Sequence, residues 1–438
     1  MKILLVNAEN MGGVEYYRMM APALALAKKY PEFDITSCSG INRDTMEIVR
    51  ETGLDTGKTK EHAEPLIVPI NDFLKQFDLV HFCRGIDMFN EPNNADRLNR
   101  LGIPFGLDLD DYWGMPKGHI LEKDYKLKRQ DEAIVQSIKA AHFVTCTTPI
   151  LAREIEQYNK NVFVIENGID DTAEAWQPDF SKANVMRFGF YQGSTHMEDI
   201  KLASDDVVKI FDSGLPAQIV LSGFIAGKVS SEGEFNRFCK EYFNSIRLNP
   251  ESALAVETKK DLYVKYTEGS LIAPSYYIGF EQAITNNLKV IKNPAYKEYL
   301  MKCMSDNNHE WMNENYWRVW GTHVNNWGYT YNFCDVSLVP LVHNTFNKMK
   351  SELKLIEAGF KGKAVIVSDV NPYKLLATDK NTFLVKGINS WYKQIKYCIE
   401  NPNAVIDKAN QLHEDVKAKY RLSDLVDKRK MLYEMYKA

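Results

Sequence analysis

The segment FNKMKSELKLIEAGFKGKAVIVS, from Phe346 to Ser368, has residue types suited to binding phosphate. Its periodicity predicts a helix from Ser351 to Phe360, for which Ser351 is the expected N-cap. Gly362 stands just past the end, where helices commonly stop. The preceding strand would place the helix start at the strand's carboxyl end, where free N–H groups bind phosphate. The segment therefore predicts a phosphate site at the start of this helix.

Charged side chains around the same helix can bind the rest of a nucleotide. Lys350 and Lys354 add positive charge beside the expected phosphate site. Glu357 follows Lys350 by seven residues, about two helical turns, so the two are expected on one face. A carboxylate there can accept hydrogen bonds from a ribose diol. The alternative is an amphipathic surface helix with an ion pair between Glu357 and Lys361.

A second candidate lies in FGFYQGSTHMEDIK, from Phe188 to Lys201, where a strand, a Gly/Ser loop and a helix are expected in succession. Gly193 lets the backbone approach a ligand closely, and Ser194 with the neighbouring amides can bind oxygen atoms. His196 or Lys201 can supply positive charge that stabilises a departing nucleoside diphosphate. The alternative is an ordinary helix start with a surface histidine. We favour the phosphate site, because the loop follows the strand that opens the second half of the chain.

Three carboxylates, Asp108, Asp110 and Asp111, end an expected strand in the segment GLDLDDYWGMPKGH. Their mutual repulsion requires solvation or partners. Asp110 and Asp111 are the candidates to orient or deprotonate an acceptor hydroxyl, with His119 nearby. A solvated loop is the expected setting of Asp108. Carboxylates also suit Mg²⁺ or Mn²⁺, so a metal at this position stays open.

The first strand is followed by AENMGGVEYYR, which contains Gly12 and Gly13 and places Arg18 about one turn into the next helix. The spacing is not the G-x-G-x-x-G fingerprint, so a nicotinamide cofactor is poorly supported.

Short apolar strands that alternate with helices predict an α/β fold with parallel sheets covered on both faces. In the first half, the expected strands are Lys2–Val6, Ile35–Cys38, Leu79–Phe82, Pro104–Leu109, Phe143–Cys146 and Val162–Ile165. The pattern restarts after a polar linker, 170–182, with strands expected at Arg187–Tyr191, Gln218–Ser222, Asp335–Val339 and Ala364–Ser368. Sheets of this kind bind ligands at the carboxyl ends of their strands.

The pattern predicts an N-terminal Rossmann-like domain over 1–182 and a C-terminal one over 183–420. The stretch 224–330 is too long for one connection and is expected to hold an insert. This stretch has four tryptophans, Trp311, Trp317, Trp320 and Trp327, which are expected to form a local core.

Composition narrows the class of protein. The 438 residues carry a net charge of -4, which gives no general attraction for a polyanion, so a nucleic acid partner is disfavoured. Seven scattered cysteines without a C-x-x-C pair argue against disulfides and structural zinc and favour the cytoplasm. No apolar stretch approaches about 20 residues, so no membrane-spanning helix is expected.

The run S-x-L-K-x-x-E-A, which begins at Ser351, resembles the donor-binding signature of retaining GT-B glycosyltransferases, the group called family four. That signature usually has two glutamates. Glu357 matches the second, whereas Met349 stands at the position of the first. Ser194 stands where the family commonly has an arginine, so His196 is expected to substitute for it. The D-x-D-D-Y-W run also resembles a bacterial and phage-type group of these proteins.

The resemblance implies two facing Rossmann-like domains with a central cleft, the first for the acceptor and the second for the donor. A last helix, about 421–438, would pack back on the N-terminal domain. The catalytic candidates are then Asp110, Asp111 and His196. The implied donor-binding residues are Gly12, Gly13, Arg18, Gly193, Ser194, Lys201, Lys350, Ser351, Lys354 and Glu357.

The implied reaction transfers a sugar from a nucleotide-diphosphate sugar to a hydroxyl of a saccharide or glycolipid. By the same resemblance, the anomeric configuration is retained, and no cofactor or metal is required. Three alternatives stay open: a modified base in phage DNA as the acceptor, a sugar-nucleotide epimerase of the same fold, and a non-catalytic nucleotide-sugar-binding scaffold. A clustered basic face would favour DNA, whereas turnover of donor without acceptor would indicate an epimerase. The missing first glutamate keeps the scaffold open.

Overall fold

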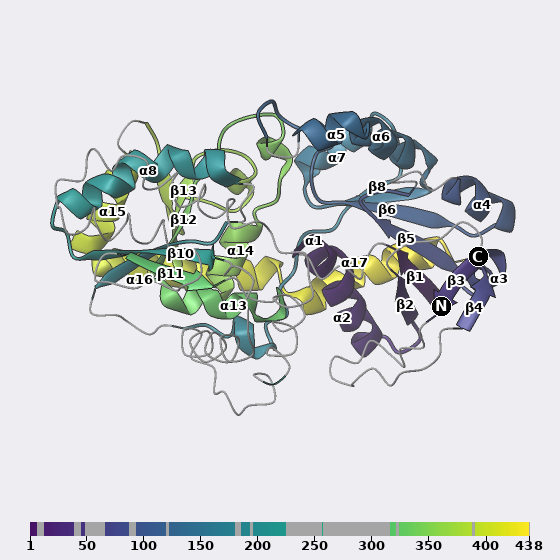
Figure 1. The fold of residues 1–438 in the computed structure, drawn as a ribbon. Helices are drawn as coiled ribbons and strands as arrows, with labels where there is room; N and C mark the ends of the chain where they lie inside the picture. Colours follow the sequence, from purple (N-terminus) through teal and green to yellow (C-terminus); the bar gives the residue numbers. More distant parts are fainter. Residues whose placement is uncertain are drawn as a thin grey trace, which may run out of the picture. The chain divides into compact units, whose positions relative to one another are not determined.

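The computed structural model describes residues 1–6, 13–38, 45–48, 66–86, 93–119, 122–179, 185–192, 196–224, 256, 316–320, 324–387 and 390–437. The chain forms two compact units, each built on its own six-stranded sheet (Figure 1). Unit 1 comprises Met1–Asp170, Asn344–Ser351 and Tyr420–Ala438, and unit 2 comprises Asp171–His343 and Glu352–Lys419. The α/β class with two Rossmann-like sheets that the sequence predicts is confirmed.

The sheet of unit 1 is parallel throughout. Its strand order is β2 (Asp34–Cys38), β1 (Lys2–Val6), β5 (Leu79–Cys83), β6 (Phe105–Leu109), β7 (Phe143–Cys146) and β8 (Val162–Val164). β5, β6 and β7 are buried along their whole length, as expected for strands covered on both faces. The chain adds β2 on one side of β1 and β5 on the other, so a topological switch point lies at the carboxyl ends of β1 and β5.

Helices cover both faces of this sheet, as Figure 1 shows. One face packs against α3 (Ile70–Leu74), α4 (Asn94–Leu101), α6 (Gln130–Ala140) and α7 (Pro149–Ile155). The other face packs against α2 (Ala21–Lys29) and the C-terminal helix α17 (Leu422–Met435), which contact each other. An antiparallel pair is formed by β3 (Thr45–Ile48) and β4 (Leu66–Pro69).

Two helical stretches of unit 1 are interrupted. The first begins as α1 (Gly13–Glu15), passes through a π-helical turn, η1 (Tyr16–Met20), and continues as α2. The second is divided into α5 (Glu122–Leu127) and α6, because Arg129 adopts a positive φ of 49° between them.

The sheet of unit 2 is also parallel. Its order is β11 (Tyr316–Trp320), β10 (Ala217–Phe224), β9 (Met186–Phe190), β12 (Val336–Val339), β13 (Ala364–Ser368) and β14 (Phe383–Val385). The core on one face is completed by α8 (Met197–Asp212), α15 (Ser390–Glu400) and α16 (Pro402–Lys419). The strand order reverses between β9 and β12, so the switch point of unit 2 lies at their carboxyl ends.

Shorter elements complete unit 2. They are η2 (Glu174–Trp176), η5 (Val324–Asn326), α13 (Trp327–Thr330), η6 (Tyr331–Phe333), α14 (Leu353–Phe360) and η8 (Tyr373–Leu375). α14 ends where the sequence predicts, since Gly362 follows it with a positive φ of 66°.

Two expectations about unit 2 need correction. Part of the expected linker, 171–179, packs within unit 2, because Trp176 is buried and the carbonyl of Gln177 accepts a hydrogen bond from Lys361. The end of the expected insert supplies β11 to the main sheet, paired with β10, instead of a separate core. Residues 225–255 and 257–315, including Trp311, lie outside the described residues.

Candidate active site

A histidine–carboxylate pair lies at the switch point of unit 2, where the loops after β9 and β12 meet. His196 Nδ1 lies 2.6 Å from Asp199 Oδ2, and both residues stand at the start of α8. The other carboxylate oxygen of Asp199 accepts the N–H of Val342 at 2.7 Å, in the loop after β12. Asp199 therefore orients the imidazole and joins two loops that follow neighbouring strands.

A buried side-chain amide, that of Gln192, connects the same two loops at the switch point. The Gln192 Nε2 group donates to the carbonyl of Pro340 at 2.7 Å, and the N–H of Leu341 donates to Ser368 Oγ at 3.0 Å. Gln192 is 3% exposed, and its Oε1 has no hydrogen-bond partner in the part of the chain that the structure describes. A buried acceptor without a donor is costly, and a bound ligand or water can satisfy it.

A second polar group surrounds Glu357 on α14. Its Oε2 accepts hydrogen bonds from Lys354 Nζ and from the Tyr331 hydroxyl, both at 2.8 Å, and the residue is 1% exposed. The Lys354 ammonium lies 5.2 Å from the centre of the Trp327 ring, and Tyr331 stacks on Tyr191, next to the switch point, at 4.2 Å. The alternative of a Glu357–Lys361 surface pair is wrong, because Lys361 donates to the carbonyl of Gln177.

A buried phenol connects the two polar groups electrostatically. Burial raises the pKa of Tyr373, and the nearby charges of Asp199 and Glu357 raise it further. Tyr373 therefore interacts electrostatically with both carboxylates. Tyr373 is neutral at any physiological pH and adds no charge of its own to this region.

The expectation for Ser351 and Lys350 needs correction, since neither residue lies in the helix that carries Glu357. α14 begins at Leu353 and has no side-chain N-cap hydrogen bond. Ser351 and Lys350 belong to unit 1, where Ser351 Oγ accepts a hydrogen bond from Asn167 Nδ2 at 2.9 Å. Contrary to the prediction from the sequence, Lys350 and Glu357 therefore do not lie on one face of the same helix.

The predicted catalytic carboxylates of unit 1 are each paired with a cation. Arg84 binds Asp110 through two hydrogen bonds, of 3.1 and 3.2 Å, and Lys350 Nζ lies 3.3 Å from Asp111 Oδ1. Arg84 follows β5 at the switch point of unit 1 and has a positive φ of 68°, which is uncommon for a residue with a side chain. Such backbone strain persists only where the surroundings enforce it, and it concentrates at functional sites.

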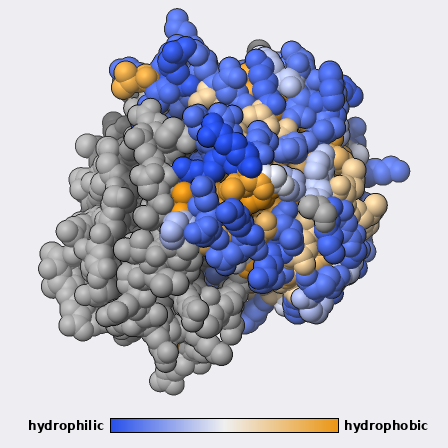
Figure 2. Space-filling view, turned by 90° about the vertical axis from the view of Figure 1, so that its right-hand side faces the viewer, coloured by the Kyte–Doolittle hydropathy of each residue, from blue (hydrophilic) through white to orange (hydrophobic). Residues whose placement is uncertain are grey.

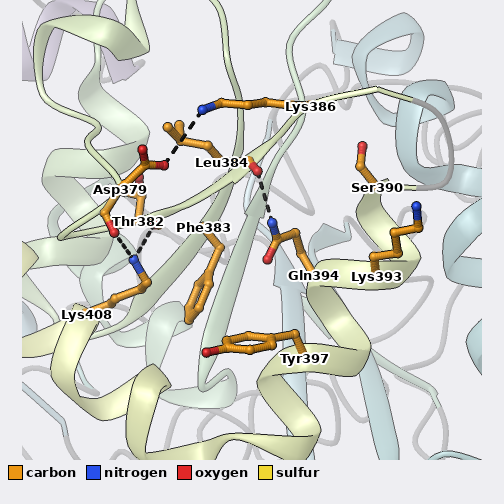
Figure 3. Close-up of a pocket in the computed structure, with 10 residues that line it drawn as sticks. All are labelled: Asp379, Thr382, Phe383, Leu384, Lys386, Ser390, Lys393, Gln394, Tyr397 and Lys408. Atoms are coloured by element: carbon orange, nitrogen blue, oxygen red, sulfur yellow. Dashed lines mark hydrogen bonds and ion pairs between the residues drawn. The ribbon is translucent and has the colours of Figure 1, made fainter.

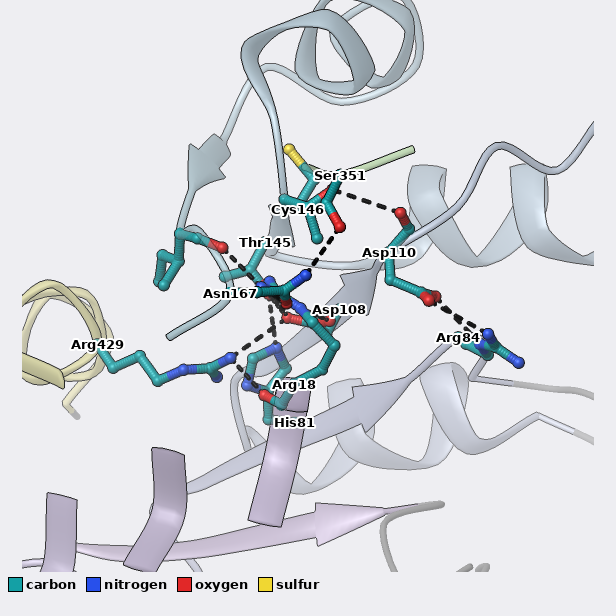
Figure 4. A network of polar contacts seen from close by, with 12 residues as sticks. Arg18, His81, Arg84, Asp108, Asp110, Thr145, Cys146, Asn167, Ser351 and Arg429 are labelled. Atoms are coloured by element: carbon teal, nitrogen blue, oxygen red, sulfur yellow. Dashed lines mark hydrogen bonds and ion pairs between the residues drawn. The ribbon is translucent and has the colours of Figure 1, made fainter. Parts of the chain in front are cut away.

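Asp108 and Arg18 form the centre of a buried network, drawn in Figure 4. Arg18 Nε and Nη2 each lie 2.9 Å from a carboxylate oxygen of Asp108, and both side chains are 1% exposed. The remaining nitrogen, Nη1, donates to the Ile165 carbonyl at 2.7 Å and to Asn167 Oδ1 at 3.2 Å. The expectation that Asp108 lies in a solvated loop is therefore wrong.

Arg18 has a structural position in the core of unit 1. The nitrogens of its guanidinium bind protein oxygens, and the side chain has almost no contact with solvent. Burial acts to raise the pKa of Asp108, but the charge and hydrogen bonds of Arg18 outweigh it, so that pKa is lowered. The donor-binding role of Arg18 stays a prediction from the family resemblance, and in the structure its side chain lies in the core of unit 1.

The C-terminal helix reaches the same network. Arg429, on α17, has its Nη2 atom 3.6 Å from Asp108 Oδ2. His81 is completely buried between the Tyr433 hydroxyl at 2.9 Å and the Thr145 hydroxyl at 3.3 Å. Burial lowers the pKa of His81 to about 3, so this imidazole is neutral in the folded protein.

The remaining predicted residues lie elsewhere. Gly12, Gly193 and Ser194 are outside the described residues. Gly13 begins α1, and Lys201 forms an exposed pair with Glu198 on α8. Met349, which stands at the position of the first glutamate, is buried in the core of unit 1, and the His119 ring packs near Phe346.

Several residues of these groups are not apparent from the sequence. Asp199, Gln192 and Arg84 stand directly after strands or at a helix start, a placement that sequence alone indicates only weakly. Trp327 lies at the end of the expected insert and Tyr331 directly after it. The contacts of Tyr331 and Trp327 with α14 span 26 and 27 positions (357 − 331 and 354 − 327). No local pattern reveals such contacts.

Two kinds of feature are absent from the described residues. No group of three or more His, Cys, Asp or Glu side chains there is arranged to hold a metal ion. No helix in that part of the chain has the length and apolar character needed to cross a membrane. The five cysteines described are buried free thiols, namely Cys38, Cys83, Cys146, Cys334 and Cys398.

Comparison with solved structures identifies the fold. Sucrose-phosphate synthase from Thermosynechococcus elongatus is similar with a TM-score of 0.55 and 12% identity, over 99% of this chain and 98% of that one. Anabaena HepE in complex with UDP and glucose has a TM-score of 0.55 and 12% identity, over 99% of each chain. A glycosyltransferase from Rickettsia africae has a TM-score of 0.54 and 11% identity, over 99% of this chain and 98% of that one.

These neighbours are GT-B glycosyltransferases, and the chain has the GT-B fold. No protein-family profile matches the chain, and no curated protein is detectably similar to it in sequence. At 11–12% identity the likeness establishes the fold alone.

Proposed function

We propose that this chain is a glycosyltransferase that transfers a sugar from a nucleotide-diphosphate sugar to an acceptor hydroxyl. The observation that carries the proposal lies at the switch point of unit 2. Gln192 and Asp199 each bind the loop after β12, and Asp199 also binds His196. Doubly wound sheets bind nucleotides at such points. The fold shared with HepE, whose structure contains UDP and glucose, supports the same assignment.

In this proposal unit 2 binds the donor. Glu357, fixed by Lys354 and Tyr331, accepts hydrogen bonds from the ribose, and Lys354 adds positive charge near the diphosphate. His196, oriented by Asp199, stabilises negative charge on the departing nucleoside diphosphate. The bond between the anomeric carbon and the diphosphate oxygen breaks, and a bond from that carbon to the acceptor oxygen forms.

Unit 1 acts on the acceptor in the same proposal. Asp110 and Asp111 orient the hydroxyl, and one of them receives its proton as the new bond forms. Their partners Arg84 and Lys350 hold the two carboxylates in place. The acceptor is a saccharide or glycolipid hydroxyl, the anomeric configuration is retained, and no cofactor is required.

Ligand binding to the intact chain tests the donor site. UDP, GDP, ADP, dTDP and CMP, each with a common sugar conjugate, are screened by thermal shift and calorimetry, with and without Mn²⁺. A micromolar ligand at millimolar concentration stabilises the fold by about 4 kcal/mol, so a selective shift is readily measured. We expect one nucleoside diphosphate to bind selectively and Glu357→Gln to weaken it at least about tenfold.

The matched control is Glu414→Gln, at an exposed glutamate of α16, which should bind the same nucleotide as the wild type does. Donor turnover is then followed with and without candidate acceptors. Turnover of the donor without any acceptor would contradict the transferase assignment and indicate an epimerase. A screen in which no nucleotide stabilises well-folded protein would overturn the donor site itself.

A further inference from the structure

A cavity along the outer strand of unit 2 takes no part in the proposed reaction. It has a volume of about 400 Å³ and lies where β14 meets α15 and α16. β14 is the last strand of the sheet, and β13 separates it from β12 and the switch point. A volume of this size is typical of sites for small molecules.

Lysines from three elements surround this cavity, as Figure 3 shows. Lys408 comes from α16, Lys393 from α15, and Lys386 follows β14. Lys386 is only loosely paired, 3.8 Å from Asp379, and both side chains are largely exposed. Lys393 is exposed and has no ion-pair partner among the residues that the structure describes. In Figure 3 the Lys386 ammonium points to Asp379 and the Lys393 ammonium lies on the other side of the group, so positive charge stands on two sides of the cavity.

The interior of the cavity combines aromatic and uncharged polar surfaces. Phe383 and Tyr397 pack edge to face at 6.1 Å, and Lys408 lies over the Phe383 ring at 5.0 Å. The Tyr397 ring is 45% exposed, so one side of it is open to a ligand. Gln394, held by a hydrogen bond from its Nε2 to the Leu384 carbonyl at 3.1 Å, stands near the centre of the group (Figure 3).

We propose that this cavity binds a phosphorylated sugar. The phosphate would bind Lys393 and draw the exposed Lys386 ammonium away from its loose pair with Asp379, and the C–H face of the sugar would stack on Tyr397. The Gln394 amide and the Asp379 carboxylate would bind hydroxyl groups of the sugar. An anion alone would use only the lysines, whereas a neutral sugar would leave the Lys393 ammonium without an anionic partner. The combination of features selects a ligand that carries both.

Calorimetry on the full chain with glucose 6-phosphate, glucose and inorganic phosphate tests the proposal. Glucose 6-phosphate is expected to bind at least about tenfold more tightly than either of the other two, because it alone uses both sets of contacts. The double variant Lys386→Ala with Lys393→Ala should weaken it at least about tenfold. Lys396→Ala is the matched control, because Lys396 lies on the same helix, pairs with Glu400 and does not line the cavity.

Saturating UDP is added to separate this site from the candidate donor site. Unchanged affinity for glucose 6-phosphate in the presence of UDP supports a separate site, whereas displacement by UDP would overturn it. Absence of binding at about 10 mM, or equal affinity in the double lysine variant, would also overturn the proposal. Equal affinity for inorganic phosphate would show that no sugar is recognised. None of these outcomes depends on transferase activity.

Discussion

At the scale of single residues, two side-chain contacts hold the buried carboxylate of Glu357 in one orientation. Its Oε2 receives two hydrogen bonds, one from the Lys354 ammonium and one from the Tyr331 hydroxyl. Such charge-assisted hydrogen bonds stabilise the ion and restrict its rotation. A carboxylate held in this way is suited to bind a diol without reorganisation.

Removing one of these donors should weaken nucleotide binding. In Tyr331→Phe the ring still stacks on Tyr191, but Glu357 loses one hydrogen bond that fixes it. We expect the Kd for the nucleoside diphosphate to rise about threefold to tenfold, measured by calorimetry. Tyr158→Phe, at an exposed tyrosine of unit 1, serves as the control. An unchanged Kd in Tyr331→Phe would show that Glu357 is positioned without this hydroxyl.

Arg84 is expected to position Asp110 for the proposed transfer. Lysine at this position keeps the charge but cannot form the two parallel hydrogen bonds that the guanidinium makes. Arg84→Lys should therefore lower kcat about tenfold and leave the KM for the donor unchanged, with a shifted pH profile of kcat. Full activity in Arg84→Ala would remove Arg84 from the proposed mechanism. Lys126→Ala, at an exposed lysine of α5, is the control.

At the scale of the elements, close approach of backbone segments decides where helices pack. Gly328 lies in α13, and a Cβ built there would come within 2.2 Å of the Ala175 carbonyl oxygen. Residue 175 belongs to the segment that the sequence treats as a linker. The contact shows why that segment has a fixed position in unit 2.

Gly328→Ala should therefore destabilise unit 2, although alanine usually stabilises a helix by about 1 kcal/mol relative to glycine. The clash involves backbone atoms that cannot rotate away, so we expect a loss of about 1–3 kcal/mol in the free energy of unfolding. Gly13→Ala is the matched control, because a Cβ at that helical glycine meets none of the described residues within 4 Å. Urea denaturation of both variants measures the difference. Equal stability of the two would mean that the Ala175 segment moves freely.

At the scale of the whole molecule, each unit is assembled from distant parts of the sequence. The face of unit 1 visible in Figure 2 is largely hydrophilic, with hydrophobic side chains in small patches. Its interior contains the Arg18–Asp108 network, which joins α17 to the sheet through Arg429 and His81. Burial shifts the pKa of ionisable groups in this network relative to the unfolded chain, so the stability of unit 1 depends on pH.

His81 should make unit 1 lose stability in acid. Its pKa is about 3 in the folded state, against 6.5 for a histidine exposed to water, so below pH 6.5 the unfolded chain binds a proton that the folded chain does not. The free energy of unfolding therefore falls as the pH decreases from 6.5 towards 3, by up to a few kcal/mol. His81→Gln should reduce this slope, as measured by urea denaturation at several pH values. His142→Gln is the control, and an identical slope in all three proteins would contradict the assignment.

The sequence by itself determined the elements that local periodicity specifies. Strands such as Phe143–Cys146 and Ala364–Ser368 agree with the structure to the residue, because short apolar runs between turn residues leave few alternatives. The same holds for the end of α14 at Gly362, where only the local backbone matters. The order of these elements is sufficient to predict an α/β fold with two parallel sheets.

The tertiary structure alone decided the partners of the polar residues. Ser351 has the local sequence of an N-cap, yet its hydroxyl binds Asn167, which lies 184 positions away. Asp108 binds Arg18 across 90 positions, and burial turns what reads as a solvated loop residue into the centre of a core network. Hydrogen-bond partners depend on which chain segments come together in space, and residue types along the chain carry little information about that.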